Sequence, residues 1–426
     1  MTRLKNIYLT VFFYLAVTGV FAQDYDFEIP EEEKATLELN GNLDAKWGLL
    51  QVRENSPFYE IQFYNMSDRE DYLSQYRLDF YLDGIYRYKQ IGFFMKTFSQ
   101  YVKEEPISAS FFELYGSVNL SPRWQISIGK RRFNWGTGYA FNPVGYVNAE
   151  KDPENPDLAL AGRASVYFSY NRSFASSFLQ NFSISALLLP PEAENNDKFS
   201  PADETGGAMK IYFLLNNIDI DLLTIYNKDK PVRFGLDFSA NIKENLEIHA
   251  EFSHAVDEIK LAFNDTMLTN RKTNGGSYLL GFRYLNRFNT TIIGEYYHNN
   301  SGFSKNEFVT SMKRLHSFID SNTPEVIDQA KIEMSTVFRS KTVMRDYLYI
   351  KINQPEPFSW LHSSVSVFTI YNLNDNSYLV SPQLSYKPYT NFEVILWPFL
   401  FCGGKYTEYG SKQFQKKLEI WMRFYF

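Results

Sequence analysis

Few residues of this 426-residue chain have the types and spacing that catalysis requires. Its five histidines are scattered, and an extended strand would place His249 and His254 on opposite faces. The sequence contains no nucleophile elbow, zinc-protease helix or phosphate-binding loop signature. A single cysteine, Cys402, excludes an internal disulfide and a paired-cysteine metal site. We therefore expect a protein that is not an enzyme and that uses no metal or cofactor.

The most distinctive stretch is 129–143, with the sequence GKRRFNWGTGYAFNP. Gly136 and Gly138 permit a positive φ or a close backbone approach, and Pro143 ends a strand. A strand that begins near Trp124 therefore leaves its sheet around Phe133 and continues as a long, ordered loop.

The order of motifs in and after this stretch resembles a known group of proteins. Basic Arg131–Arg132 is followed by W-G-x-G at 135–138, by Asn142–Pro143 and by Asp152–Pro153. This order resembles porin-like outer-membrane barrels of Gram-negative bacteria, related in pattern to alginate-export and similar substrate channels. The resemblance implies a transmembrane barrel and a substrate channel, but no particular substrate. It covers residues 129–163 and the overall architecture, and the other strands carry no motif of the group.

Charged side chains at a narrow point of such a barrel would set its preference among ions and solutes. We expect the loop after Phe133 to fold into the barrel, although a loop that only covers the rim is an equal alternative. The candidate constriction residues are Arg131, Arg132, Trp135, Glu113, Asp79 and Arg77. The inward-facing charges show a modest acidic excess, which predicts a weak preference for cations or the handling of uncharged polar solutes.

The elements that would position these residues show hydrophobicity of period two. In 76–83 and in 246–253 one face is apolar and the other is charged, as in a strand with two different surroundings. A soluble sandwich shares this pattern, but these segments approach the ~10 residues of a tilted membrane strand. High aromatic content, 18%, combined with a mean hydropathy of −0.34 fits aromatic girdles around a polar lumen. The sequence thus predicts an all-β, transmembrane antiparallel up-and-down β-barrel.

Short and long connections alternate along the chain, as in barrels whose short turns are periplasmic. We expect about eighteen strands, with sixteen as the alternative, and closure of the sheet because an open edge is excluded in lipid. Segment 58–66 is strand-like but falls in an expected outer loop. The expected long connections are 133–163, 190–206, 257–275, 299–345 and 401–415.

The connection 299–345 changes to helical spacing. Ser304 and Glu307 form a capping-box pattern, and Thr323 with Pro324 marks a second helix start. We expect a helical hairpin inserted in one extracellular loop. It either covers the pore or forms a surface loop with a small core of its own.

The two ends of the chain complete the predicted organisation. Residues 1–22 have a basic start and an apolar run typical of a cleaved signal peptide, with an uncleaved anchor helix as the alternative. Residues 23–35 would form a periplasmic segment, and 36–426 the outer-membrane barrel. An alternating last strand with Phe426 at its end resembles the signal that the barrel-assembly machinery recognises.

These patterns favour a porin-like channel or transporter for small polar or amphipathic solutes in a Gram-negative outer membrane. The alternatives are a barrel that acts as an enzyme, a sheath or a surface-binding protein for polysaccharide or another partner. Expected partners are outer-membrane lipid and a small solute. Nucleic acid is excluded by the net charge of −6 and by the absence of a basic block, while oligomerisation stays open.

Overall fold

A computed structural model describes residues 36–65, 70–158, 160–191, 204–228, 230–263, 268–321, 323–338 and 340–426. The expected signal peptide, 1–22, and the expected periplasmic segment, 23–35, lie outside these residues.

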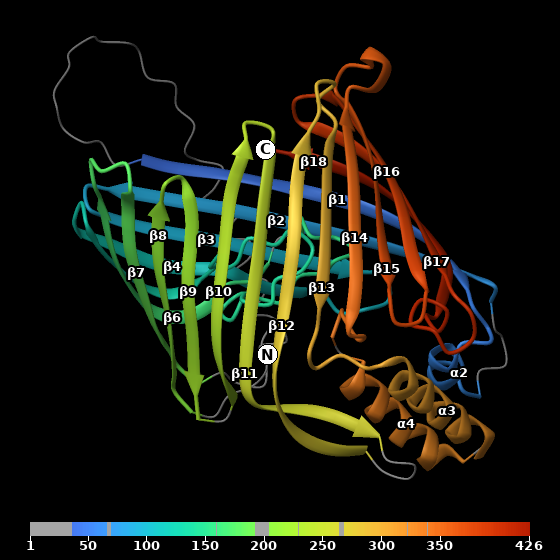
Figure 1. Ribbon diagram of the computed structural model, residues 1–426. Coiled ribbons are helices and arrows are strands. Elements are labelled where there is room, and N and C mark those ends of the chain that lie inside the picture. The colour runs from blue at the N-terminus through green and yellow to red at the C-terminus, as the bar shows by residue number, and fades with distance from the viewer. Residues whose placement is uncertain are drawn as a thin grey trace, which may run out of the picture. The chain divides into compact units, whose positions relative to one another are not determined.

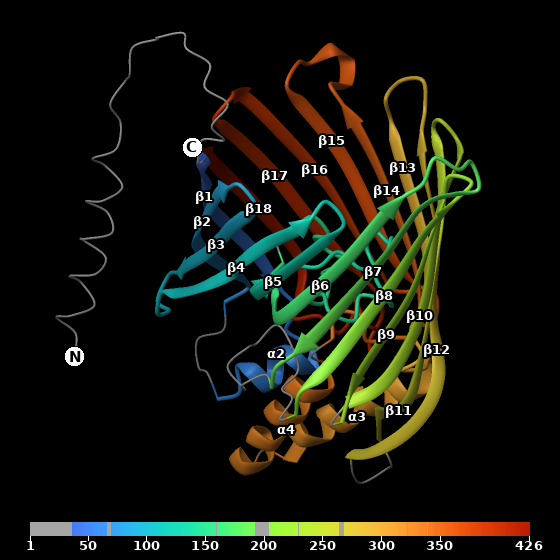
Figure 2. The ribbon, with the colours of Figure 1, turned by 90° about the vertical axis from the view of Figure 1, so that its left-hand side faces the viewer.

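Within the described residues, eighteen antiparallel strands form one sheet (Figures 1 and 2). Each strand pairs with its neighbours in the chain, and β1 also pairs with β18, so the sheet is a closed barrel and the sixteen-stranded alternative does not apply. The strands are β1 (Thr36–Val52), β2 (Tyr72–Tyr88), β3 (Ile91–Val102), β4 (Ser108–Ser121), β5 (Trp124–Arg131), β6 (Arg163–Ser173), β7 (Leu179–Leu189), β8 (Gly206–Leu215), β9 (Ile218–Asn227), β10 (Lys230–Lys243), β11 (Leu246–Phe263), β12 (Leu268–Leu285), β13 (Thr291–His298), β14 (Asp346–Pro355), β15 (Ser363–Asn372), β16 (Tyr378–Tyr389), β17 (Phe392–Cys402) and β18 (Phe414–Tyr425).

The wall has an apolar outer face and an inner face that carries the charges. On β1, Asp44 and Lys46 are buried inside, while the side chain of Leu43 is exposed outside. On β12, Leu280 is 56% exposed and its neighbour Leu279 is fully buried. A lysine or arginine on the lipid side would cost about 2–4 kcal/mol at mid-membrane, so the basic residues favour this orientation in the strands that carry them.

The two rims differ as the sequence predicts. One rim, at the top of Figure 1, has tight turns such as Asn216–Asn217, where both residues take a positive φ that asparagine tolerates. Phe426 belongs to this short-turn rim, where its backbone pairs with Gly41 at 2.9 and 3.1 Å. The opposite, long-loop rim carries the connections between β5 and β6 and between β13 and β14.

One expectation about the long-loop rim was wrong, and one ambiguous segment is decided. The strand-like segment 58–66 falls in the loop, as expected, and its residues 58–62 belong to a short helix, α2 (Pro57–Gln62), that starts on a proline and is capped by Ser56. The connection 257–275 is mostly not a loop, because β11 and β12 stay paired as far as Phe263 and Leu268. A bulge after Ala255, with Asp257 at a φ of 58°, lets the pairing resume beyond it.

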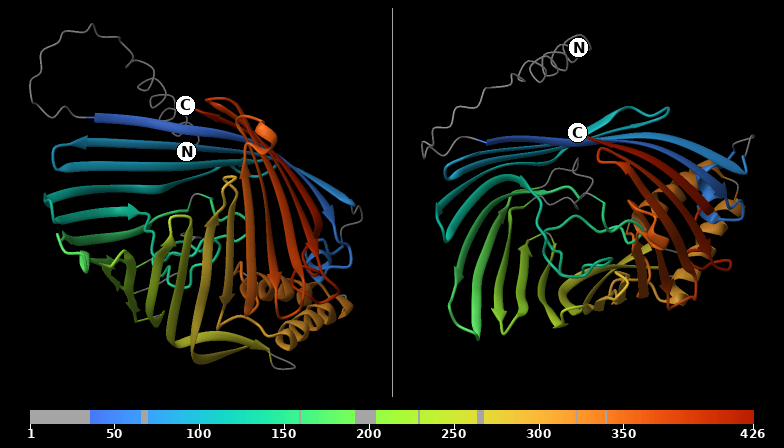
Figure 3. Two further views of the ribbon diagram at one scale, coloured as in Figure 1. Left: turned by 45° about the horizontal axis from the view of Figure 1, so that its top comes forward. Right: turned by 90° about the horizontal axis from the view of Figure 1, so that it is seen from above.

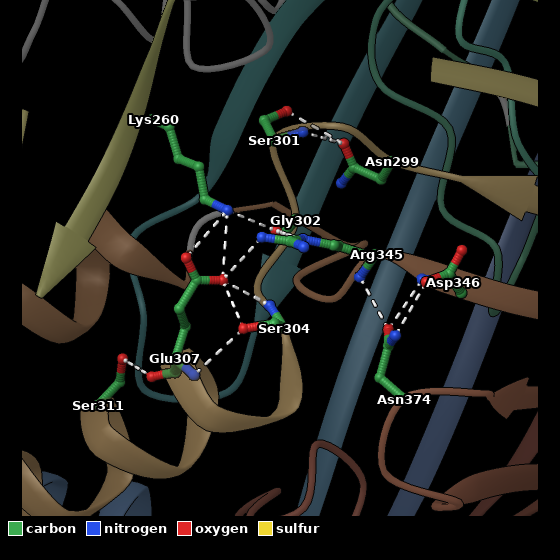
Figure 4. A network of polar contacts seen from close by, with 10 residues as sticks. All are labelled: Lys260, Asn299, Ser301, Gly302, Ser304, Glu307, Ser311, Arg345, Asp346 and Asn374. Carbon is green, nitrogen blue, oxygen red and sulfur yellow. Dashed lines mark hydrogen bonds and ion pairs between the residues drawn. The ribbon is translucent and has the colours of Figure 1, made fainter. Parts of the chain in front are cut away.

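The helical hairpin is present as α3 (Lys305–Ser321) and α4 (Pro324–Val337). Its capping box forms, since the Ser304 N–H donates to Glu307 Oε2 at 2.7 Å and the Glu307 N–H to Ser304 Oγ at 3.4 Å. Glu307 also pairs with Lys260 of β11 at 3.3 Å and with Arg345 at 3.1 Å, so the hairpin is tied to the barrel wall (Figure 4). Among the described residues, no helix combines the length and apolar character needed to cross a bilayer.

Candidate functional site

The connection between β5 and β6, described at residues 132–158 and 160–162, lies inside the ring of strands (Figure 3). The ring of Phe141 stacks on that of Tyr297, an inward residue of β13, with centroids 4.8 Å apart. The Tyr146 hydroxyl lies 2.8 Å from Ser253 Oγ on β11. This inward loop therefore crosses the lumen to the opposite wall, as the first of the two expected placements requires.

Two carboxylates of the opposite wall hold the inward loop. Six backbone N–H groups of residues 137–144 donate to Glu251 of β11 and Glu295 of β13, and these two side chains are almost fully buried. The donors to Glu251 are Thr137 and Gly138, both at 2.6 Å, and Val144 at 3.2 Å. The donors to Glu295 are Tyr139, Ala140 at 2.9 Å and Phe141 at 3.4 Å. Hydrogen bonds to charged acceptors are the stronger kind, so this segment has a fixed position in the lumen.

The glycines of the W-G-T-G motif make this approach possible. Gly136 has a φ of 89°, and a Cβ on Gly138 would lie 2.2 Å from the Phe141 carbonyl oxygen. Lys151 completes the turn by donating to the carbonyls of Gly138 and Tyr139. Burial lowers the pKa of Lys151, although the nearby carboxylates of Glu251 and Glu295 act in the opposite direction.

The structure places three of the candidate constriction residues at the root of the inward loop. The Arg131 guanidinium lies 4.5 Å from the centre of the Tyr167 ring and donates to Ser127 Oγ at 3.2 Å. The Arg132 side chain is exposed, and its backbone N–H donates to Glu113 Oε2 at 3.0 Å. The structure thus brings Arg132 and Glu113 together.

The other three candidates lie elsewhere. Trp135 is buried in an apolar cluster of the loop with the inward residues of β7–β9, such as Leu187 and Leu223. Arg77 and Asp79 of β2 form an ion pair at 3.2 Å, and Asp79 also binds Lys46 at 2.7 Å. The sequence therefore grouped residues from three places: the root of the inward loop, the inner face of β2, and the apolar cluster around Trp135.

A cavity of about 1140 Å³ extends from the inward loop toward the long-loop rim. Its basic lining residues are Arg77, Arg163, Lys230, Arg233, Lys260 and Lys341. Its acidic lining residues are Asp79, Glu150, Asp152 and Glu258. Among the described residues, basic groups therefore outnumber acidic groups in the cavity lining. The sequence predicted the opposite, a modest acidic excess, for the inner face as a whole. The difference arises because several inward carboxylates, Glu251 and Glu295 among them, are used to hold the loop.

The inward loop also contacts the helical insertion. Glu150 Oε1 accepts hydrogen bonds from Ser340 Oγ at 2.7 Å and from the Lys341 N–H at 3.1 Å. Lys341 Nζ lies 3.3 Å from Asp152 Oδ2. We call these interactions the loop–hairpin contact, because residues 340 and 341 directly follow the hairpin in the chain.

Sequence reasoning missed Glu251 and Glu295 as functional residues. Alternation placed both correctly on the inner face, but it assigned them to the general lumen charge. The available signal was a glycine-containing turn with many free N–H groups, together with inward acids in the same chain. Nothing in the spacing of residues 114 positions apart indicates that Thr137 meets Glu251.

Comparisons with known proteins give a fold but no family. No family model and no curated protein matches the chain. Three solved structures from Pseudomonas aeruginosa are similar. OccK1 (OpdK) has a TM-score of 0.57 at 9% identity, covering 93% of this chain and 99% of its own. OccK3 (OpdO) has a TM-score of 0.55 at 8% identity, covering 92% and 95%. OccK2 (OpdF), solved in complex with glucuronate, has a TM-score of 0.54 at 8% identity, covering 91% and 98%. The chain therefore shares the closed β-barrel fold of these outer-membrane porins.

Proposed function

We propose that this protein is a porin-like channel of a Gram-negative outer membrane that passes small polar or amphipathic solutes. One observation carries the proposal: a long loop lies inside the barrel and is held there by Glu251 and Glu295. A barrel of this size is wide enough for an aqueous channel unless its interior is filled, so such a loop narrows it. Passage then depends on the width and charge of the remaining opening, with no covalent chemistry.

In this proposal the candidate residues divide into three roles. Arg77 and Asp79 line the cavity through which a solute reaches the loop. Arg131, Arg132 and Glu113 set the charge at the root of the loop. Trp135 acts as a positioning residue, since its buried indole fixes the loop against β7–β9. The long-loop rim faces the exterior, and the last strand mediates assembly into the membrane.

Single-channel recording of refolded protein in planar bilayers tests the proposal. The wild type should give discrete ion-conducting steps, and deletion of 137–144 should raise the conductance. Arg131→Ala and Arg132→Ala should change the ratio of cation to anion permeability. Lys331→Ala, on the exposed face of α4, is the matched control and should leave this ratio unchanged. Absence of steps from correctly folded wild type would overturn the proposal.

A further inference from the structure

Three aromatic rings lie together on the inner face of β2, β3 and β4. The ring centroids of Tyr81 and Phe98 are 4.9 Å apart, and those of Phe98 and Phe112 are 4.8 Å apart. This aromatic trio lines the large cavity, together with Ala161 of the inward loop. Tyr81 and Phe112 are buried, whereas Phe98 is partly exposed.

A β-bulge turns Phe112 into the lumen. Strict alternation would place Phe112 on the outer face with Leu114, as its position in the sequence predicts. Instead the register with β3 shifts, so that Lys96 faces Glu113 while Thr97 faces Phe111. Phe111 and Leu114 are both about half exposed on the outside, at 47% and 49%, and Phe112 between them is 5% exposed. Bulges commonly re-aim a side chain at a functional surface, and this one adds a third ring to the trio.

The cavity has two unlike walls. Beside the trio, Leu189 and Ile225 add apolar surface from β7 and β9. The strands of the trio also contribute polar groups to the lining, from Arg77 and Asp79 of β2 and Gln100 of β3. The wall formed by β10 and β11 instead contributes Arg233, Glu258 and Lys260. Ligand sites typically combine an apolar and aromatic lining with a few polar groups that fix orientation. A solute that fits both walls has one flat apolar face and a polar edge.

We propose that the aromatic trio is a stacking subsite for a solute that carries a flat ring with an apolar face. Aromatic rings and the pyranose rings of sugars share this chemistry. The inference rests on the proposed channel function and names the class of solute that the channel retains before the inward loop. Phe98 offers the accessible ring, and Tyr81 and Phe112 hold it in place through tilted ring contacts.

The test is block of the ion current by three neutral probes: benzamide as an aromatic ring, cellobiose as a sugar, and sorbitol as a ring-free polyol. Phe98→Leu keeps an apolar side chain but removes the ring, and Phe98→Trp restores one. Phe93→Leu is the matched control, since Phe93 is on the same strand and 55% exposed on the outer face. We expect Phe98→Leu to weaken block by one or both ring probes about 3- to 10-fold. Phe98→Trp should recover the block by the ring probes. Phe93→Leu should leave this block unchanged, and sorbitol should act equally on every variant.

The probe that responds identifies the source of the ring, aromatic or sugar. The inference is overturned if ring probes block wild type and Phe98→Leu equally, or if they block no better than sorbitol. In both cases an intact ion current would leave the channel function standing. Loss of the ion current in the wild type would instead contradict the channel function itself.

Discussion

Glu251 and Glu295 illustrate how buried carboxyl groups are satisfied mainly by backbone N–H groups. Each accepts from three N–H groups of the inward loop, and Glu295 also lies 3.1 Å from His249 Nε2. A buried N–H group that loses its acceptor costs about 1–3 kcal/mol. The fixed position of the loop therefore depends on these two residues as well as on its own glycines and Trp135.

Glu251→Gln and Glu295→Gln should loosen the inward loop while the barrel remains folded. Each amide nitrogen replaces an accepting oxygen with a donor, which leaves at least one loop N–H without an acceptor. We expect larger fluctuations of the single-channel current and faster proteolysis within 137–144. Asp83→Asn is the matched control, because Asp83 is an inward acid of β2 paired with Lys96 at 3.2 Å. Current traces identical to the wild type in both glutamine variants would contradict this role.

Glu408 should make stability depend on pH. It lies in the connection between β17 and β18, where it accepts from Tyr347 Oη at 2.9 Å and Asn372 Nδ2 at 2.8 Å. Burial raises the pKa of Glu408 from 4.5 to about 7. Because the folded state favours the protonated carboxyl group, this group adds to the free energy of unfolding, and its contribution is fully present below the ordinary pKa of 4.5. That contribution is lost as the pH rises through about 7.

The measurement is urea unfolding of the vesicle-embedded protein at pH 4.5 and pH 8. At 1.36 kcal/mol per pKa unit, the wild type should lose roughly 3 kcal/mol more over this range than Glu408→Gln does. The glutamine keeps the shape of the side chain but does not titrate. Equal losses in the two proteins would show that folding does not raise the pKa of Glu408.

At the scale of elements, the hydrogen-bond ladder between β16 and β17 is interrupted, and a serine side chain replaces one of the missing backbone donors. Pairing is continuous up to Val380 with Leu400 and resumes at Leu384 with Leu396 in the same register. Pro382 therefore stands directly opposite Pro398, and neither has an N–H to donate. Ser381 Oγ donates to the Pro398 carbonyl at 2.8 Å and replaces one of the missing donors. Such compensation matters because lipid offers no alternative donor.

Ser381→Ala should destabilise the barrel by about 1–3 kcal/mol, because the Pro398 carbonyl would be left without its donor. Ser366→Ala is the matched control, since Ser366 is also a buried inward serine but has only a 3.5 Å contact with Gln383. Urea unfolding in vesicles compares the two variants. Equal destabilisation would mean that loss of a buried hydroxyl, and not the proline carbonyl, is responsible.

The elements were largely predictable because a barrel wall between lipid and water requires apolar and polar side chains to alternate along its strands. Eighteen strands, the inward face of Asp79 and the capping box at Ser304 all follow from such local rules. Bulges do not, since the extra residue at Phe112 is decided by pairing with β3. The extension of β11 to Phe263 likewise depends on a partner strand. For the same reason, alternation identified which residues point inward but not which of them meet the loop.

At the scale of the whole molecule, two insertions far apart in the chain meet inside one rim. The inward loop is held on the opposite wall by Glu251 and Glu295, and near the rim by the loop–hairpin contact. The hairpin is in turn fixed to β11 through Glu307 and Lys260 (Figure 4). A continuous set of polar contacts thus links the surface helices to the proposed constriction.

The loop–hairpin contact should therefore restrain the inward loop from outside the membrane. Although burial lowers it, the charge of Asp152 raises the pKa of Lys341, so this lysine stays charged over the ordinary range of pH. Asp152→Asn and Lys341→Met should each increase current fluctuations, and the double variant should add little, because both remove the ion pair between Lys341 Nζ and Asp152 Oδ2. Lys331→Met is the control, since it breaks an exposed pair with Asp328 on α4.

High salt should reduce the effect of Lys341→Met, because the Lys341 side chain is 56% exposed and salt screens its ion pair. Additive effects of Asp152→Asn and Lys341→Met would show that the two residues act independently and that their ion pair does not restrain the loop.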